Sequence, residues 1–145
     1  MISIGRISDA GTRFDENWLV VRSLKNGVPS GAKQVASLSP SKDLFYRYLD
    51  VKKAGKFDQG WFQSEYIPVF LREIKDNREA RTLLNRLCQV SVSKDILLAC
   101  FCPDEALCHR SILAGLLLGA GAKIKCSNEY AQYFRMYRDM SSGVI

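Results

Sequence analysis

The sequence has no apolar run long enough to cross a bilayer. Its longest run, residues 112–122, is interrupted by three glycines, whereas a spanning helix needs about 20 consecutive apolar residues. The opening stretch MISIGRISDAG lacks the basic flank and long apolar segment of a secretory signal. These absences predict a cytoplasmic protein without membrane contacts.

Long runs of like charge, internal repeats and low-complexity segments are also missing. The 21 basic and 15 acidic residues give a formal net charge of +6, but the basic residues are scattered. This charge mildly favours anionic partners such as nucleotides, nucleic acid or phosphorylated metabolites. A length of 145 residues, 47% of them hydrophobic, predicts a single domain over residues 1–145.

Histidine is nearly absent and cysteine is unevenly distributed. The only histidine, His109, lies in the segment CFCPDEALCHR beside three of the five cysteines, Cys100, Cys102 and Cys108. An odd and clustered count is unlike the disulfide framework of a small secreted protein. We therefore expect reduced thiols and a site at this cluster, and we expect the other two, Cys88 and Cys126, to pack as small apolar residues.

Strand and helix patterns alternate along the chain. Short apolar or β-branched runs predict strands at residues 1–7, 18–24, 95–100 and 122–126. Helices are predicted from Pro40 with Ser39 as the cap, over residues 62–74, after Asn77, over residues 111–118 and after Ser127 or Asn128. This order predicts a small three-layer α/β fold with a mostly parallel sheet flanked by helices, Rossmann-like or flavodoxin-like.

Pro68 lies inside the second predicted helix. Proline lacks the backbone N–H and its ring clashes with the preceding turn. We therefore expect a kink or break there.

The cysteine cluster lies where a buried strand ends and a helix begins. Ligands of open α/β sheets bind outside the carboxyl ends of strands, and a helix N-terminus attracts anions. Arg6 and Arg22 lie near the ends of two other predicted strands, and Arg110 lies in the first turn of the helix or just before it. The three would form a clamp for a phosphate or carboxylate. Alternatively, Arg6 and Arg22 are surface residues paired with nearby carboxylates.

Side-chain geometry separates the cysteines. Cys100 and Cys102 would share one face of an extended strand, whereas helical Cys108 and His109 would diverge by about 100°. The better catalytic pair is thus Cys102, or Cys100, with His109, where a thiolate acts as nucleophile and the imidazole as general acid or base. The predicted ligand-binding residues are Arg6, Arg22, Cys100, Arg110 and Ser111.

Two further hypotheses for the cluster remain open. The first is a Cys₃His zinc site, although the spacing is not C-x-x-C and the adjacency of Cys108 and His109 makes it hard for both to bind one ion. Reversible pairing of Cys102 with Cys108 is the other. Neither a resident metal nor any particular cofactor is part of the preferred hypothesis.

The last helix offers a nucleic-acid alternative, because it interleaves tyrosines with Arg135 and Arg138. Tyr130, Phe134 and Tyr137 fall on one stripe, which favours docking of this helix onto the rest of the fold.

Several segments in order resemble the domain-of-unknown-function 488 (DUF488, or YeaO-like) family. They are an opening strand with Ser3-Ile4-Gly5, a second strand ending in Val20-Val21-Arg22, the stretch LSPSKDLF, an aromatic pair Phe62 and Tyr66, and a strand ending at Cys100 followed by Cys108-His109-Arg110. Two departures are Leu19, where the family usually has an acidic residue, and Cys102, near the place of a frequent Glu. The resemblance implies a small α/β fold with a site around Cys-His-Arg and no established reaction.

The preferred functional hypothesis is a small nucleotide- or nucleoside-processing enzyme, or a binder of such ligands. If the protein is an enzyme, a hydrolase or transferase acting on a nucleotide, a nucleoside or a phosphorylated small molecule is expected. The alternatives are a nucleic-acid-binding module and a metal or thiol-redox protein. The sequence specifies neither the substrate nor the oligomeric state.

Overall fold

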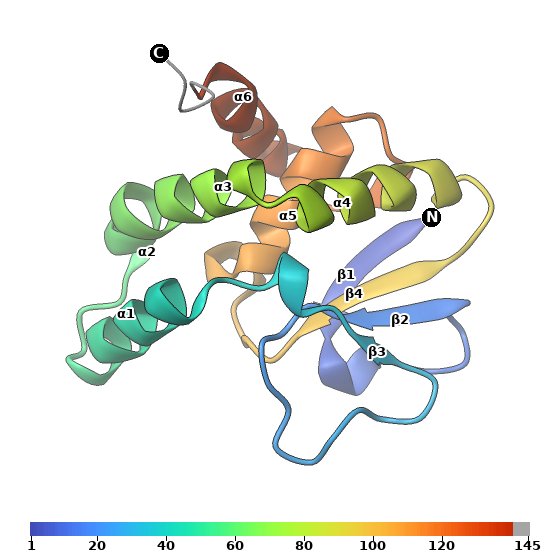
Figure 1. Cartoon of the computed structure of the whole chain (residues 1–145), viewed down its shortest axis with the longest axis horizontal. Coiled ribbons are helices and arrows are strands. Elements are labelled where there is room, and N and C mark those ends of the chain that lie inside the picture. Colours follow the sequence, from blue (N-terminus) through green and yellow to red (C-terminus); the bar gives the residue numbers. More distant parts are fainter. Residues whose placement is uncertain (141–145) are drawn as a thin grey trace.

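The computed structural model describes residues 1–140 and has a five-stranded sheet within them (Figure 1). The strand order is β3-β2-β4-β1-β5 and every pairing is parallel. The strands are β1 (Ile2–Arg6), β2 (Glu16–Leu19), β3 (Lys33–Gln34), β4 (Ile96–Cys100) and β5 (Ile124–Lys125). The expected α/β fold with a parallel sheet flanked by helices is confirmed.

The α-helices are α1 (Lys42–Lys53), α2 (Gln59–Trp61), α3 (Ile67–Asp76), α4 (Arg78–Val90), α5 (His109–Gly119) and α6 (Ala131–Asp139). Short 3₁₀ turns are η1 (Ile7–Asp9), η2 (Ala36–Leu38), η4 (Glu105–Leu107) and η5 (Asn128–Tyr130), and η3 (Phe62–Tyr66) is a π-helical segment. Among the helices of residues 1–140, none combines the length and hydropathy that a bilayer span requires.

Strand β4 lies at the centre of the sheet and is buried along its whole length. It pairs with β1 on one side and with β2 on the other, as its continuous apolar sequence predicts. Strand β2 begins and ends earlier than the predicted residues 18–24. Its regular pairing stops at Leu19, although the N–H of Val20 still donates to the carbonyl of Ala99 at 2.9 Å.

Helix α5 forms a middle layer between the sheet and the outer helices. It contacts β1, β4 and β5 on one side and α3, α4 and α6 on the other, and Figure 1 shows α3 and α4 passing across it. Nine of its eleven residues are buried, because its sequence is apolar around the whole circumference. This burial fixes the position of its first turn, where the cysteine cluster lies.

Helix α1 begins two residues later than expected. Its cap is Ser41, whose Oγ accepts a hydrogen bond from the N–H of Leu44 at 3.2 Å and donates one to Glu73 at 2.5 Å. Ser39 instead donates to the carbonyl of Ala36. The Ser39 assignment was wrong because a carboxylate from α3 stabilises the later cap. Helix α4 follows Asn77 as predicted, and Asn77 is its cap.

Pro68 perturbs its helix without ending it. The helical backbone runs from α2 through η3 into α3, and Pro68 lies in the first turn of α3. The residues before it adopt π-helical hydrogen bonding, with the N–H of Ile67 donating to the carbonyl of Phe62. The wider π turn accommodates the proline ring and the missing N–H. Just before Pro68 the helix therefore changes from α-helical to π-helical hydrogen bonding, and it continues without a break.

The tight contact between α5 and α6 predicts a large cost for a side chain at Gly115. A Cβ there would overlap the carbonyl oxygen of Tyr130, so Gly115→Ala should lower the free energy of unfolding by about 1–3 kcal/mol despite the better helix propensity of alanine. Chemical denaturation followed by circular dichroism measures this. Gly11→Ala is the control, since a Cβ there meets no atom within 4 Å; equal stability of both variants would contradict the packing described.

Glu16 predicts a pH dependence of stability. Its carboxylate accepts hydrogen bonds from Trp18 Nε1 and Lys94 Nζ, both at 3.0 Å, and pairs with Lys33 at 3.4 Å. These contacts, that of Trp18 first, lower the pKa of Glu16 from 4.5 to about 2. A lowered pKa stabilises the fold above the unfolded value, and this contribution disappears as the pH falls through the folded value.

Glu16→Gln should therefore lower the melting temperature at neutral pH, and the difference from the parent protein should shrink between pH 4.5 and about 2. Melting temperatures measured across this range test the expectation. Glu129→Gln serves as a control at an exposed carboxylate. A difference that stays constant with pH would show that the Glu16 charge contributes nothing.

Candidate functional site

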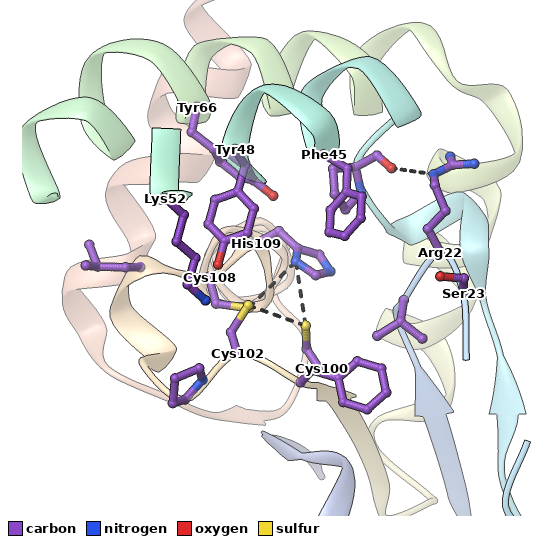
Figure 2. A pocket seen from close by; sticks show the side chains of 15 residues that line it. Arg22, Ser23, Phe45, Tyr48, Lys52, Tyr66, Cys100, Cys102, Cys108 and His109 are labelled. Atoms are coloured by element: carbon purple, nitrogen blue, oxygen red, sulfur yellow. Dashed lines mark hydrogen bonds between the residues drawn. The ribbon is translucent and has the colours of Figure 1, made fainter. Parts of the chain in front are cut away.

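Three cysteines meet where β4 leads into α5. Cys100 is the last residue of β4, Cys102 follows two residues later, and Cys108 is the N-cap of α5. Their sulfur atoms all lie within 4.8 Å of one another, and those of Cys100 and Cys102 are 3.8 Å apart (Figure 2). The expectation that Cys100 and Cys102 face the same way agrees with this geometry.

The His109 imidazole lies beside two of these sulfurs. Its Nε2 is 2.6 Å from the carbonyl oxygen of Val20, just beyond the end of β2. A carbonyl only accepts hydrogen bonds, so Nε2 carries the proton and Nδ1 presents its lone pair. Nδ1 is 3.6 Å from the sulfur of Cys108 and 4.0 Å from that of Cys100. The ring therefore faces the cluster with an acceptor.

The side chains of Cys108 and His109 do not diverge as expected. That expectation required both residues to be helical, but Cys108 has an extended backbone with φ −128° and ψ 148°. A residue before the first helical turn escapes the 100° rotation per residue, so both side chains turn to one point. The imidazole contacts Cys100 and Cys108, while Cys102 reaches the group through Cys100. The argument from adjacency against joint action of Cys108 and His109 is thereby removed.

The three thiols have different proton affinities. The pKa of Cys100 is lowered, first by hydrogen bonding with Cys102 and next by hydrogen bonding with Cys108. Hydrogen bonding to Cys100 raises the pKa of Cys102 to about 11, and burial foremost raises that of Cys108. Cys100 is thus the most acidic of the three thiols.

The side chain of Arg110 is a cation buried next to the cysteine cluster. It is only 2% exposed, and its Nη1 donates to the carbonyl of Cys100 at 3.3 Å. Within residues 1–140 its Nε has no hydrogen-bond partner and no carboxylate pairs with it. Arg110 also acts to lower the pKa of Cys102, against the larger opposing influence of Cys100. The guanidinium is therefore the countercharge of the cluster.

The other predicted ligand-binding residues occupy separate places. Arg22 lines the cavity described below, and its Nε donates to the carbonyl of Pro40 at 2.8 Å. Arg6 is exposed and is not part of the cavity lining. Ser111 is fully buried and donates to the carbonyl of Cys108 at 2.7 Å. The three arginines consequently do not converge into one clamp.

A cavity of about 210 Å³ opens above the cysteine cluster. Figure 2 shows Arg22 and Lys52 on opposite sides of it, with aromatic rings between them. Its lining comprises Val21, Arg22, Ser23, Pro40, Phe45, Tyr48, Lys52, Tyr66, Cys100, Phe101, Cys102, Pro103, Leu107, Cys108 and His109. Sequence reasoning missed the contribution of α1, whose aromatic run LFYRYL was the available signal.

The aromatic wall is continuous with the imidazole. Tyr48 contacts Tyr66 edge-on with ring centroids 6.3 Å apart, Tyr66 stacks on Phe70, and Phe70 meets the His109 ring at 5.6 Å. Burial raises the pKa of both tyrosines, so both stay neutral phenols at physiological pH. The cavity thus has a neutral aromatic wall, cations at its rim and thiols at its floor.

A family model described as the active DUF488-N3 subclade matches residues 2–121. The chain belongs to the DUF488 family. The matched segment contains every residue of the cavity lining as well as Arg110, and it ends before α6. Neither the curated proteins nor the solved structures gave a match. Family membership agrees with the resemblance carried by Cys100 and the Cys108-His109-Arg110 motif.

The contact with Val20 predicts a single tautomer for His109. In its neutral form the imidazole should carry its proton at Nε2 and not at Nδ1, because Nε2 faces a carbonyl and Nδ1 faces the thiols. Long-range ¹H–¹⁵N correlation spectra distinguish the two nitrogens, and His109 is the only histidine. Observation of the Nδ1–H tautomer would overturn the orientation of the ring.

Proposed function

We propose that this DUF488 protein is an enzyme, a hydrolase or transferase, that acts on a nucleoside or nucleotide bound in the cavity above the cysteine cluster. The observation that carries this proposal is the combination of aromatic walls, two rim cations and a thiol-imidazole floor in one cavity. The description of the matched subclade as active supports an enzyme.

The size and lining of the cavity favour a ligand with one ring system inside it. About 210 Å³ is below the 300–1,000 Å³ of pockets that enclose drug-sized ligands. Nucleobases stack on aromatic side chains with roughly 1–3 kcal/mol per base, and Phe45, Tyr48 and Tyr66 offer such rings. The remaining, more polar part of the ligand would extend to the rim.

The rim cations favour an anionic group on that part. Within the described residues, neither Arg22 nor Lys52 has a carboxylate partner, so both charges are available to a phosphate. The Pro40 carbonyl orients the guanidinium of Arg22, and an oriented guanidinium binds phosphate with two parallel hydrogen bonds. Nucleotides therefore fit better than uncharged nucleosides.

The reactive centre in this proposal is the floor of the cavity. Cys100, Cys102 and Cys108 supply sulfur ligands or nucleophiles, and Nδ1 of His109 accepts or returns a proton beside them. Cys100 is the nucleophile in this proposal in place of Cys102, because its sulfur lies 4.0 Å from Nδ1 of His109 and its pKa is lowered, whereas that of Cys102 is raised.

The nucleic-acid alternative loses its main motivation. Tyr130 and Tyr133 are buried, and α6 packs closely on α5. Aromatic rings held in this way are unavailable for stacking on bases, which supports the docking interpretation of the last helix.

Nucleotides should raise the melting temperature of the protein by an amount that grows with ligand concentration. Nucleoside mono-, di- and triphosphates, free nucleosides and inorganic phosphate form the panel, and mass spectrometry of the incubated ligand detects conversion. Arg22→Gln should weaken nucleotide binding by about tenfold, since a hydrogen bond to a charged group contributes about 1.5–3 kcal/mol. Lys52→Gln should weaken it less.

Lys53→Gln is the matched control, because Lys53 follows Lys52 on α1 but does not line the cavity. Equal loss in the Lys53 and Lys52 variants would show a diffuse charge effect. If no nucleotide shifted the melting temperature, the proposed ligand class would be wrong.

A further inference from the structure

The cysteine cluster brings together more sulfur atoms than a thiol nucleophile requires. A single thiolate needs one cysteine, whereas here three sulfurs from separate positions converge within 4.8 Å. A fully buried guanidinium, that of Arg110, accompanies them. The remaining cysteines, Cys88 and Cys126, lie apart from this group.

We propose that Cys100, Cys102 and Cys108 together bind one Zn²⁺ ion, with its fourth coordination position open to the cavity. A Zn–S bond is about 2.3 Å, so two thiolates of one tetrahedral ion lie about 3.8 Å apart. The sulfurs of Cys100 and Cys102 already have this separation. Since the third sulfur lies within 4.8 Å of both, small rotations of the side chains close the triangle on one ion.

Charge balance supports the same assignment. Zn²⁺ with three thiolates carries one negative charge. Arg110, which is 2% exposed and donates to the carbonyl of Cys100, is a buried cation that neutralises this charge. The thiol protons that Zn²⁺ displaces pass to the buffer, and the loaded site has no net charge. A buried unpaired charge would be costly.

The surroundings of the cluster match those of a site with an exchangeable fourth ligand. Catalytic zinc sites keep three protein ligands and one position for water or substrate. The three sulfurs line the cavity. His109 lies beside Cys100 and Cys108, but the mutually close ligand atoms are the three sulfurs alone.

His109 is therefore a neighbour of the fourth position and not a ligand. The hydrogen bond to Val20 fixes its tautomer, so that Nδ1 can accept a proton from a water molecule on the ion. Zinc binding itself stands without the proposed function; only the use of the fourth position rests on it.

Metal analysis of the purified full chain tests this inference. After growth with added zinc and dialysis against metal-free buffer, the protein should hold about one zinc ion per chain, and His109→Gln should hold the same amount. Cys100→Ser, Cys102→Ser and Cys108→Ser should each weaken zinc binding about 100-fold or more in competition with a chromogenic chelator. Cys88→Ser and Cys126→Ser are matched controls and should bind zinc like the parent.

A second measurement covers the case in which a serine variant fails to fold. The parent protein, stripped with a chelator, is titrated with Zn²⁺ by calorimetry in buffers of different ionisation enthalpy, and the observed enthalpy should change with the buffer because Zn²⁺ displaces thiol protons. Titration with Co²⁺ should give sulfur-to-cobalt charge-transfer absorption of three thiolates.

Each contrary outcome rejects a defined part of the inference. Failure of the stripped parent to rebind zinc, or loss of zinc from Cys88→Ser or Cys126→Ser alone, would overturn the site. Loss of zinc from His109→Gln would overturn the open fourth position, and iron-sulfur absorption would overturn the single ion. The nucleotide panel is repeated on the stripped protein, so that failure of nucleotide binding is recognised separately from failure of zinc binding.

Discussion

The burial of the first turn of α5 between the ends of β2 and β4 is the constraint on which the site depends. Three consecutive residues of this turn each make a different contact. His109 donates to the carbonyl of Val20, Arg110 donates to the carbonyl of Cys100, and Ser111 donates to the carbonyl of Cys108. These bonds join the helix start to both strand ends. They hold Cys108 and Cys100 at one place, although eight positions separate them in the chain.

The same burial explains the charge distribution at the floor of the cavity. A guanidinium removed from water requires a nearby anion, and within residues 1–140 no carboxylate provides it. The three thiols are the acidic groups next to it in the fold. Hydrogen bonding among the sulfurs lowers the pKa of Cys100 and raises that of Cys102, while burial raises that of Cys108.

The sequence predicted those elements of the fold whose determinants lie within a few neighbouring residues. The strand β4 and the start of α4 after Asn77 are encoded within a few residues and were confirmed. The later cap at Ser41 depends on Glu73, which is 32 residues away. Regular pairing of β2 ends at Leu19, and the carbonyl of the next residue, Val20, accepts a hydrogen bond from His109, 89 residues away. The cavity wall from α1 could not be predicted because its place over the cluster follows from packing. The extended backbone of Cys108 could likewise not be predicted from the sequence. Because of it, the side chains of Cys108 and His109 point to one place and do not diverge as expected.

The two ends of α5 serve different requirements, and this division explains its unusual sequence. Its first turn is polar yet buried, because His109, Arg110 and Ser111 each donate a hydrogen bond to a carbonyl at the strand ends or to that of Cys108. Its later turns carry Gly115 and Gly119, where any side chain would overlap Tyr130 or Phe134 of the segment leading into α6 and of α6 itself. Close approach of α6 covers the helix on the side away from the sheet and excludes water from it. A helix covered on both sides holds its first turn in place. The packing of α5 therefore fixes Cys108 relative to Cys100 on the buried strand β4, and the loop between them positions Cys102.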